Sequence, residues 1–193
     1  MKYFLIFLTV IGLSLSAREI LEDPTFKKKD KYWRLTAFEE YKNVEPKYKR
    51  KTVEFDISHT SEASYISYIT EADTKDDRIY KIEFKFKGDG QGEIFIKHMA
   101  YPNFFKRKRY IEGSPLVNLG LHQKFTPSSE WQIATCYVKS KVNKESNYMK
   151  SLLFWMGSYQ GKFTLGEISV TEAKDKQDLT LGDHGLIEVR KEK

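Results

Sequence analysis

The side chain best suited to bind a ligand is a tryptophan that departs from the core pattern of its segment. Trp155 stands between Phe154 and Met156, so if those two residues point into a core, the indole projects from the opposite face of the strand. Small ligands are commonly held by flat apolar walls with a few polar groups beside them. We therefore predict that Trp155 binds a ligand. Three further residues are predicted to bind with it: Tyr159, Tyr101 and His98.

A basic run lies in the same part of the chain. The sequence has 33 Lys and Arg against 27 Asp and Glu, and Lys106–Arg109 is one of its basic runs. Aromatic residues flank this run, a combination also found on surfaces that bind nucleic acid. We assign Arg107 and Arg109 to the attraction of an anionic polymer through their summed field. A plain solvated loop is the alternative, and nucleic acid is excluded from the prediction because the chain has an export signal.

No arrangement typical of an enzyme is present in the sequence. There is no G-x-S-x-G or H-E-x-x-H motif, no phosphate-binding glycine loop and no C-x-x-C pair. The histidines are scattered, and no two acids stand in a context that selects them for glycoside hydrolysis. The sequence favours a binding protein over an enzyme.

The first 17 residues have the composition of a signal peptide. A positive charge at Lys2 precedes an apolar run to Leu15, and small residues up to Ala17 offer a cleavage site. The run is shorter than the roughly 20 residues of a membrane span. We expect a secreted, periplasmic or otherwise extracellular protein without a membrane span. An uncleaved N-terminal anchor is the alternative.

Alternation of apolar and polar residues predicts the elements that position these side chains. Residues 78–99 read as two strands joined by the glycine-rich turn Gly88–Gly92, which we interpret as a β-hairpin. Leu165 and Ile168 are separated by one residue more than strict alternation allows. The extra residue, at Gly166-Glu167, predicts a β-bulge. The side chains predicted to share one core are Val53, Phe55, Ile57, Ile82, Phe84, Phe86, Phe163, Leu165, Ile168 and Val170.

These elements predict an all-β protein, a two-sheet antiparallel β-sandwich of residues 18–173. The single cysteine, Cys136, is expected to be buried rather than reactive. Residues 174–193 are predicted to be a charged tail, and the protein is expected to be a monomer.

Several separated segments resemble a known family. The chain is similar to carbohydrate-binding modules of the cellulose/xylan-binding (CenC-like) type, in the galactose-binding-like jelly-roll group. The similarity spans about Ile20 to Ala173 and is carried by Asp23-Pro24-Thr25-Phe26 with Trp33, by Tyr80–Phe86 with Lys87-Gly88-Asp89-Gly90, by Phe125-x-Pro127-x-x-x-Trp131-Gln132, and by Gly161–Val170.

This resemblance implies a jelly-roll sandwich that holds a polysaccharide or other glycan without altering it. It also implies a structural calcium ion, for which Glu22, Asp23 and Glu167 are the matching residues. The chain departs from the pattern at Gly166-Glu167, which supplies one carboxylate where two are common. We therefore predict an exported, non-catalytic glycan-binding module. The alternative is an extracellular or envelope interaction protein that keeps the fold without sugar binding and holds an anionic polymer through its basic loop.

Overall fold

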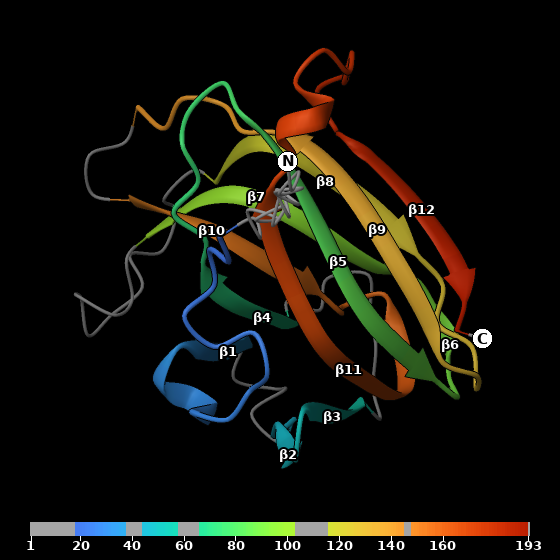
Figure 1. The fold of residues 1–193 in the computed structure, drawn as a ribbon. Coiled ribbons are helices and arrows are strands. Elements are labelled where there is room, and N and C mark those ends of the chain that lie inside the picture. The colour runs from blue at the N-terminus through green and yellow to red at the C-terminus, as the bar shows by residue number, and fades with distance from the viewer. Residues whose placement is uncertain (1–17, 38–43, 58–65, 103–115, 145–147, 193) are drawn as a thin grey trace, which may run out of the picture.

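The computed structural model describes residues 18–37, 44–57, 66–102, 116–144 and 148–192, and they form an all-β sandwich of two antiparallel sheets (Figure 1). The first sheet has five strands, in the order β1 (Trp33–Ala37), β4 (Ile66–Glu71), β10 (Tyr148–Trp155), β7 (Ile94–Pro102) and β8 (Val117–Phe125). Two three-residue 3-10 turns, η1 (Lys29–Lys31) and η3 (Lys174–Lys176), are the helical segments of the described part of the chain.

The second sheet has seven strands. Six follow one another in the order β12 (Leu186–Lys191), β9 (Gln132–Lys139), β5 (Ile79–Gly88), β11 (Tyr159–Glu172), β3 (Thr52–Ile57) and β2 (Lys47–Lys49). The seventh, β6 (Gln91–Gly92), pairs with the beginning of β11. This architecture confirms the predicted fold class.

The core lies between the sheets and is rich in phenylalanine. Each of the predicted core residues is at most 2% exposed, and all of them belong to one hydrophobic cluster. Phe84 of β5 reaches across the sandwich, with its ring centroid 5.3 Å from that of Phe125 and 5.1 Å from that of Phe154. Cys136 is also buried, as predicted, and burial raises the pKa of its thiol.

The predicted β-hairpin is wrong in its pairing. Strand β5 pairs with β9 and β11 in the seven-stranded sheet, whereas β7 pairs with β10 and β8 in the five-stranded sheet. The glycine-rich segment Gly88–Gly92 therefore carries the chain from one sheet to the other (Figure 1). At Gly92 the backbone has a φ of 101°, and a Cβ there would lie 1.9 Å from the carbonyl oxygen of Ser158. Alternation identifies the buried face of a strand but not its neighbour.

The bulge in β11 is confirmed. The register between β11 and β5 shifts between Leu165 and Ile168, which keeps the apolar residues on both sides of the shift in the core. This places Gly166 on the outer face. A Cβ added at this position would lie 3.5 Å from the indole of Trp131.

The sandwich extends beyond residue 173, the boundary predicted from the sequence. Strand β12 pairs with β9 along its whole length and forms an edge of the seven-stranded sheet. Its side chains are mostly exposed, so the apolar pattern that reveals a strand in sequence is weak there. Backbone hydrogen bonds with β9 hold this edge, together with ion pairs such as the one between Lys191 and Glu130 at 2.7 Å.

Candidate functional site

Four rings cross the outer face of the five-stranded sheet, and we call them the ring stripe: Trp155, Phe95, His122 and His184. Trp155 of β10 is paired in register with Phe95 of β7, with ring centroids 5.1 Å apart. Phe95 lies 5.4 Å from His122 of β8, which in turn lies 5.8 Å from His184 in the turn before β12. Phe154 and Met156 are fully buried, so Trp155 projects outward as the sequence pattern predicted.

A lysine covers the centre of the ring stripe. The ammonium group of Lys97 lies 4.6 Å from the ring centroid of Trp155 and 5.4 Å from that of Phe95. Both distances are typical of cation–π contacts. Burial holds the pKa of Lys97 below its ordinary value. The site thus combines partly exposed aromatic faces with a cation that has lost part of its water.

A second apolar cluster forms the base on which Trp155 packs. It comprises Ile69, Tyr101, Met149 and Leu153, all on the outer face of the same sheet. Tyr101 is only 1% exposed. The prediction that Tyr101 belongs near Trp155 is therefore right in place, but its ring supports the surface and has no face open to a ligand.

One hydroxyl beside Trp155 lacks a partner. Ser67 of β4 is paired in register with Trp155, and its side chain is fully buried. Within the described residues, Ser67 Oγ is the buried side-chain oxygen that makes no hydrogen bond. Leaving such a group unpaired costs about 1–3 kcal/mol. Because the hydroxyl is closed to solvent, it is not part of the surface open to a ligand.

The structure does not place Tyr159 on this surface. Its ring is fully buried in the core, where it lies 6.2 Å from Phe163. Its hydroxyl accepts a hydrogen bond from the Gly90 amide at 2.7 Å and donates one to the Lys162 carbonyl at 3.1 Å. The sequence prediction is wrong here because Tyr159, directly after the turn at Gly157 and Ser158, is the first residue of β11 and faces inward.

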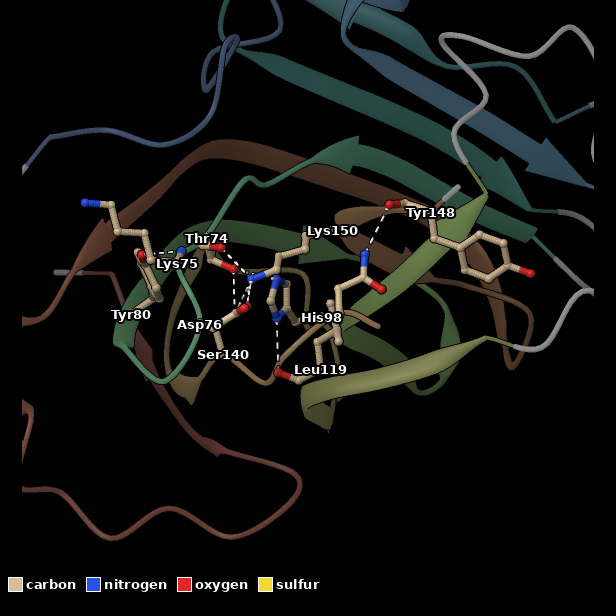
Figure 2. Close-up of polar contacts among 10 residues, drawn as sticks. Thr74, Lys75, Asp76, Tyr80, His98, Leu119, Ser140, Tyr148 and Lys150 are labelled. Atoms are coloured by element: carbon tan, nitrogen blue, oxygen red, sulfur yellow. Dashed lines mark hydrogen bonds and ion pairs between the residues drawn. The ribbon is translucent and has the colours of Figure 1, made fainter. Parts of the chain in front are cut away.

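His98 is likewise not at the surface. It lies between the sheets in a chain of buried polar groups that joins β7, β8 and β10 to the segments that follow β4 and β9 (Figure 2). Its Nδ1 lies 3.3 Å from the Leu119 carbonyl oxygen, and its Nε2 lies 3.3 Å from Oγ1 of Thr74. Burial lowers the pKa of His98 to about 4, so the ring is neutral near pH 7. The Leu119 carbonyl can only accept, so the neutral ring carries its proton on Nδ1. Its Nε2 then accepts a hydrogen bond from the Thr74 hydroxyl, which fits both contacts.

The same chain continues to a lysine at the end of the sandwich. Thr74 Oγ1 lies 2.7 Å from Ser140 Oγ, and Lys150 donates to Ser140 Oγ at 3.4 Å and to the Thr74 carbonyl at 2.6 Å. Lys150 also pairs with Asp76 (Figure 2). Each polar group has a partner, so we assign this buried chain to stability rather than to ligand binding.

A pocket of about 720 Å³ lies beside Lys150. Its walls carry charges of both signs. The acids include Glu19, Asp76 and Glu172, and the bases include Lys150. These acids are engaged: Glu19 accepts from Ser169 Oγ at 2.8 Å and Asp76 pairs with Lys150. The aromatic residue of the lining, Tyr80, is buried. The pocket therefore offers no open aromatic face, so the ring stripe is the better candidate.

Arg107 and Arg109 lie outside the described residues. The predicted anionic-polymer loop therefore stays a prediction from sequence.

The three carboxylates predicted to hold calcium have different surroundings. Both oxygens of the buried Asp23 accept backbone N–H groups, from Lys27 at 3.0 Å and Lys28 at 2.8 Å. Glu167 pairs with Lys51, and Glu22 borders the pocket beside Lys150. Among the described residues, no group of three or more His, Cys, Asp or Glu side chains is placed to hold a metal ion. The residues as placed do not fit a calcium site.

Because the three carboxylates are not grouped to hold an ion and both oxygens of Asp23 already accept hydrogen bonds, we expect the melting temperature to be the same in excess chelator and in millimolar calcium. An ion that binds only the folded state would raise the melting temperature. Differential scanning calorimetry under the two conditions measures this directly. A calcium-dependent rise would show that Glu22, Asp23 and Glu167 rearrange around an ion.

The comparisons with known proteins agree with this fold. No protein-family model and no curated protein matches the sequence. Among solved structures, the chain is similar to a carbohydrate-binding module described as CBM4, with a TM-score of 0.55, 14% identity, and coverage of 76% of this chain and 90% of that one. It is also similar to the N-terminal cellulose-binding domain of β-1,4-glucanase C from Cellulomonas fimi, with a TM-score of 0.51, 6% identity, and coverage of 73% and 88%.

An enzyme contains a similar sandwich. The α-L-arabinofuranosidase MgGH51 matches with a TM-score of 0.56 and 10% identity, over 83% of this chain but only 27% of the enzyme. At such low identities the similarity establishes the fold, a sandwich shared with carbohydrate-binding modules, and no more. No helix among the described residues is long and apolar enough to cross a membrane.

Sequence reasoning missed four members of the site: the rings of Phe95, His122 and His184, and Lys97 that covers the stripe. Phe95 was visible as the residue between Ile94 and Ile96, in the outward phase of its strand. The histidines gave no such signal, because their contact depends on β8 lying beside the turn that precedes β12.

Proposed function

We propose that the protein is an exported, non-catalytic glycan-binding protein that uses the ring stripe. The observation that carries the proposal is the pair of partly exposed rings, Trp155 and Phe95, fixed side by side on the outer face of the five-stranded sheet. The apolar face of a sugar ring stacks on such aromatic surfaces, and neighbouring polar groups then orient its hydroxyls. The sandwich shared with the CBM4 module supports this proposal.

The ring stripe is held rigidly, as a binding surface requires. Trp155 packs on the buried outer cluster, and its strand β10 lies in the middle of the five-stranded sheet between β4 and β7. A preformed surface reduces the entropy lost when a ligand binds. Export is supported by the signal-peptide composition of the first 17 residues. The absence of an enzyme motif in the sequence supports a non-catalytic role.

Replacing Trp155 by alanine is expected to remove most of the glycan affinity, about tenfold or more, which corresponds to at least ~1.4 kcal/mol. The mature protein, applied to a glycan array and then titrated with the best ligand, gives the reference affinity. Trp131→Ala is the matched control, because Trp131 is also half-buried and also lies under a lysine, Lys87 at 5.0 Å, but on the other sheet.

An array with no bound glycan would contradict the proposal and favour the interaction protein that keeps the fold without sugar binding. Equal losses for Trp155→Ala and Trp131→Ala would contradict the choice of surface.

A further inference from the structure

We propose that the ligand of the ring stripe is an anionic glycan, whose carboxylate or sulfate groups pair with Lys97 and with the histidines of the stripe. This inference rests on the proposed function and names the class of its ligand.

The first argument is the unusual position of Lys97. Nearby lysines on the same side of the molecule have carboxylate partners: Lys124 pairs with Glu93 at 2.8 Å, and Lys141 pairs with Asp183 at 2.8 Å. Lys97 makes cation–π contacts instead, and no carboxylate of the described residues pairs with it. A partly buried ammonium without a counter-ion has lost hydration that an anionic ligand would replace.

The second argument is the sign of charge around the ring stripe. Strand β7 contributes Lys97, β8 contributes His122, and the turn before β12 contributes His184. The nearest acids, Glu93 and Asp183, are already paired with lysines. Two further charged residues lie on β1 and β4, on the other side of β10 from β7. Arg34 of β1 is paired in register with Ile69. Glu71 of β4 is paired in register with Ser151, which is four residues from Trp155 along β10. The free charge at the stripe is therefore positive.

The third argument is geometric. The cation lies over the indole rather than at the margin of the sheet, and the two histidines extend the row of rings on the other side of Phe95. A sugar stacked on the exposed aromatic faces would hold its acidic group within reach of Lys97. The next residues along a polysaccharide would then meet the imidazoles. Rings and charges are thus spaced for a repeating acidic polymer rather than for an isolated ion.

This arrangement makes binding dependent on pH. Burial, and then the positive charges of Lys97 and His184, hold the pKa of His122 below its ordinary value. An anion at the stripe stabilises the protonated imidazole, so affinity for it rises as pH falls through the histidine range. Carboxylates have ordinary pKa values of about 4, so the carboxylates of an acidic glycan stay charged down to about pH 5.

The experiment compares acidic glycans with neutral forms of the same backbone. Polygalacturonate and hyaluronan supply carboxylates, chondroitin sulfate adds sulfate, and fully methyl-esterified polygalacturonate is the uncharged match. Affinity gel electrophoresis and calorimetry are run at pH 5.5 and 7.5, each at low and high salt. We expect at least one acidic polymer to bind about tenfold or more tightly than a neutral one, most tightly at pH 5.5 and low salt. Selective binding of chondroitin sulfate would identify sulfate as the group held.

Two lysine variants test whether Lys97 binds the acidic group of the glycan. Lys97→Met keeps the apolar stem that covers Trp155 and removes the charge. It is expected to weaken binding of the acidic polymer about fivefold or more, and to change binding of a neutral glycan much less than that. Lys87→Met is the matched control, because Lys87 covers Trp131 on the other sheet in the same way. That control is expected to bind the acidic polymer as the unmodified protein does.

Failure of this inference is distinguishable from failure of the proposed function. If neutral glycans bind as well as acidic ones and depend on Trp155, the inference is wrong and the proposed function stands. If an acidic polymer binds equally well to Lys97→Met, its acidic groups are bound by other residues and the inference is again wrong. If neither class binds to the unmodified protein, both are wrong.

Discussion

Replacing Phe84 by alanine should lower the free energy of unfolding by about 3–5 kcal/mol. The side chain is 1% exposed and contacts rings from both sheets, those of Phe86, Phe125 and Phe154. Its removal therefore loses burial energy and leaves a cavity at the point where the two sheets meet. Domains of this size are commonly stable by about 5–15 kcal/mol, so the loss would be between about a fifth and all of the stability.

Urea unfolding followed by tryptophan fluorescence measures this effect as a lower midpoint with an unchanged slope. Phe95→Ala is the matched control for stability, because it makes the same chemical change on the partly exposed outer face. A loss for Phe84→Ala that is no larger than the loss for Phe95→Ala would contradict the described core.

Acidification is expected to destabilise the protein through His98. Burial gives the folded state a pKa of about 4 against an ordinary value of 6.5. Below pH 6.5 the unfolded chain therefore binds a proton that the folded chain does not, so stability falls as the pH falls between these values. At about 1.4 kcal/mol for each pH unit in that interval, the loss reaches about 3 kcal/mol near pH 4.

Urea titrations at half-unit steps from pH 7.5 to 4.5 measure the slope. Most carboxylates titrate below this interval, so histidines dominate it. His98→Gln is expected to be less stable at pH 7.5 but to lose most of the pH dependence. His122→Ala is the control, since that ring is exposed, and it should keep most of the slope. An undiminished slope in His98→Gln would refute the assignment of acid sensitivity to the buried ring.

The buried polar chain and the ring stripe have opposite relations to acid. Protonating His98 places a charge between the sheets and turns Nε2 from an acceptor of the Thr74 hydroxyl into a donor, while the hydrogen bond from Nδ1 to the Leu119 carbonyl is kept. Protonating His122 adds positive charge to the outer surface, where we expect an anionic ligand. Binding measurements at pH 5.5 therefore require a parallel stability measurement, because a weaker signal in acid can arise from unfolding alone.

The sequence alone determined the main features of the core and the outward direction of Trp155. Both follow from the strict two-residue period of a strand, since one side of each strand must leave water while the other stays in contact with it. The same rule located the bulge after Leu165, because the apolar pattern slips there by one residue. These are local properties, and they need no knowledge of neighbouring strands.

The tertiary structure alone decided which strands are neighbours and which aromatic residues lie together. It placed β5 and β7 in different sheets, although they are consecutive in the chain. It placed Tyr159 and His98 between the sheets, where each makes hydrogen bonds with distant segments. The ring stripe itself joins side chains from three strands and one turn, and Lys97 gained its position from the register of β7 with β10. Pairing and register depend on the packing of the whole sandwich, and alternation within one strand carries no information about them.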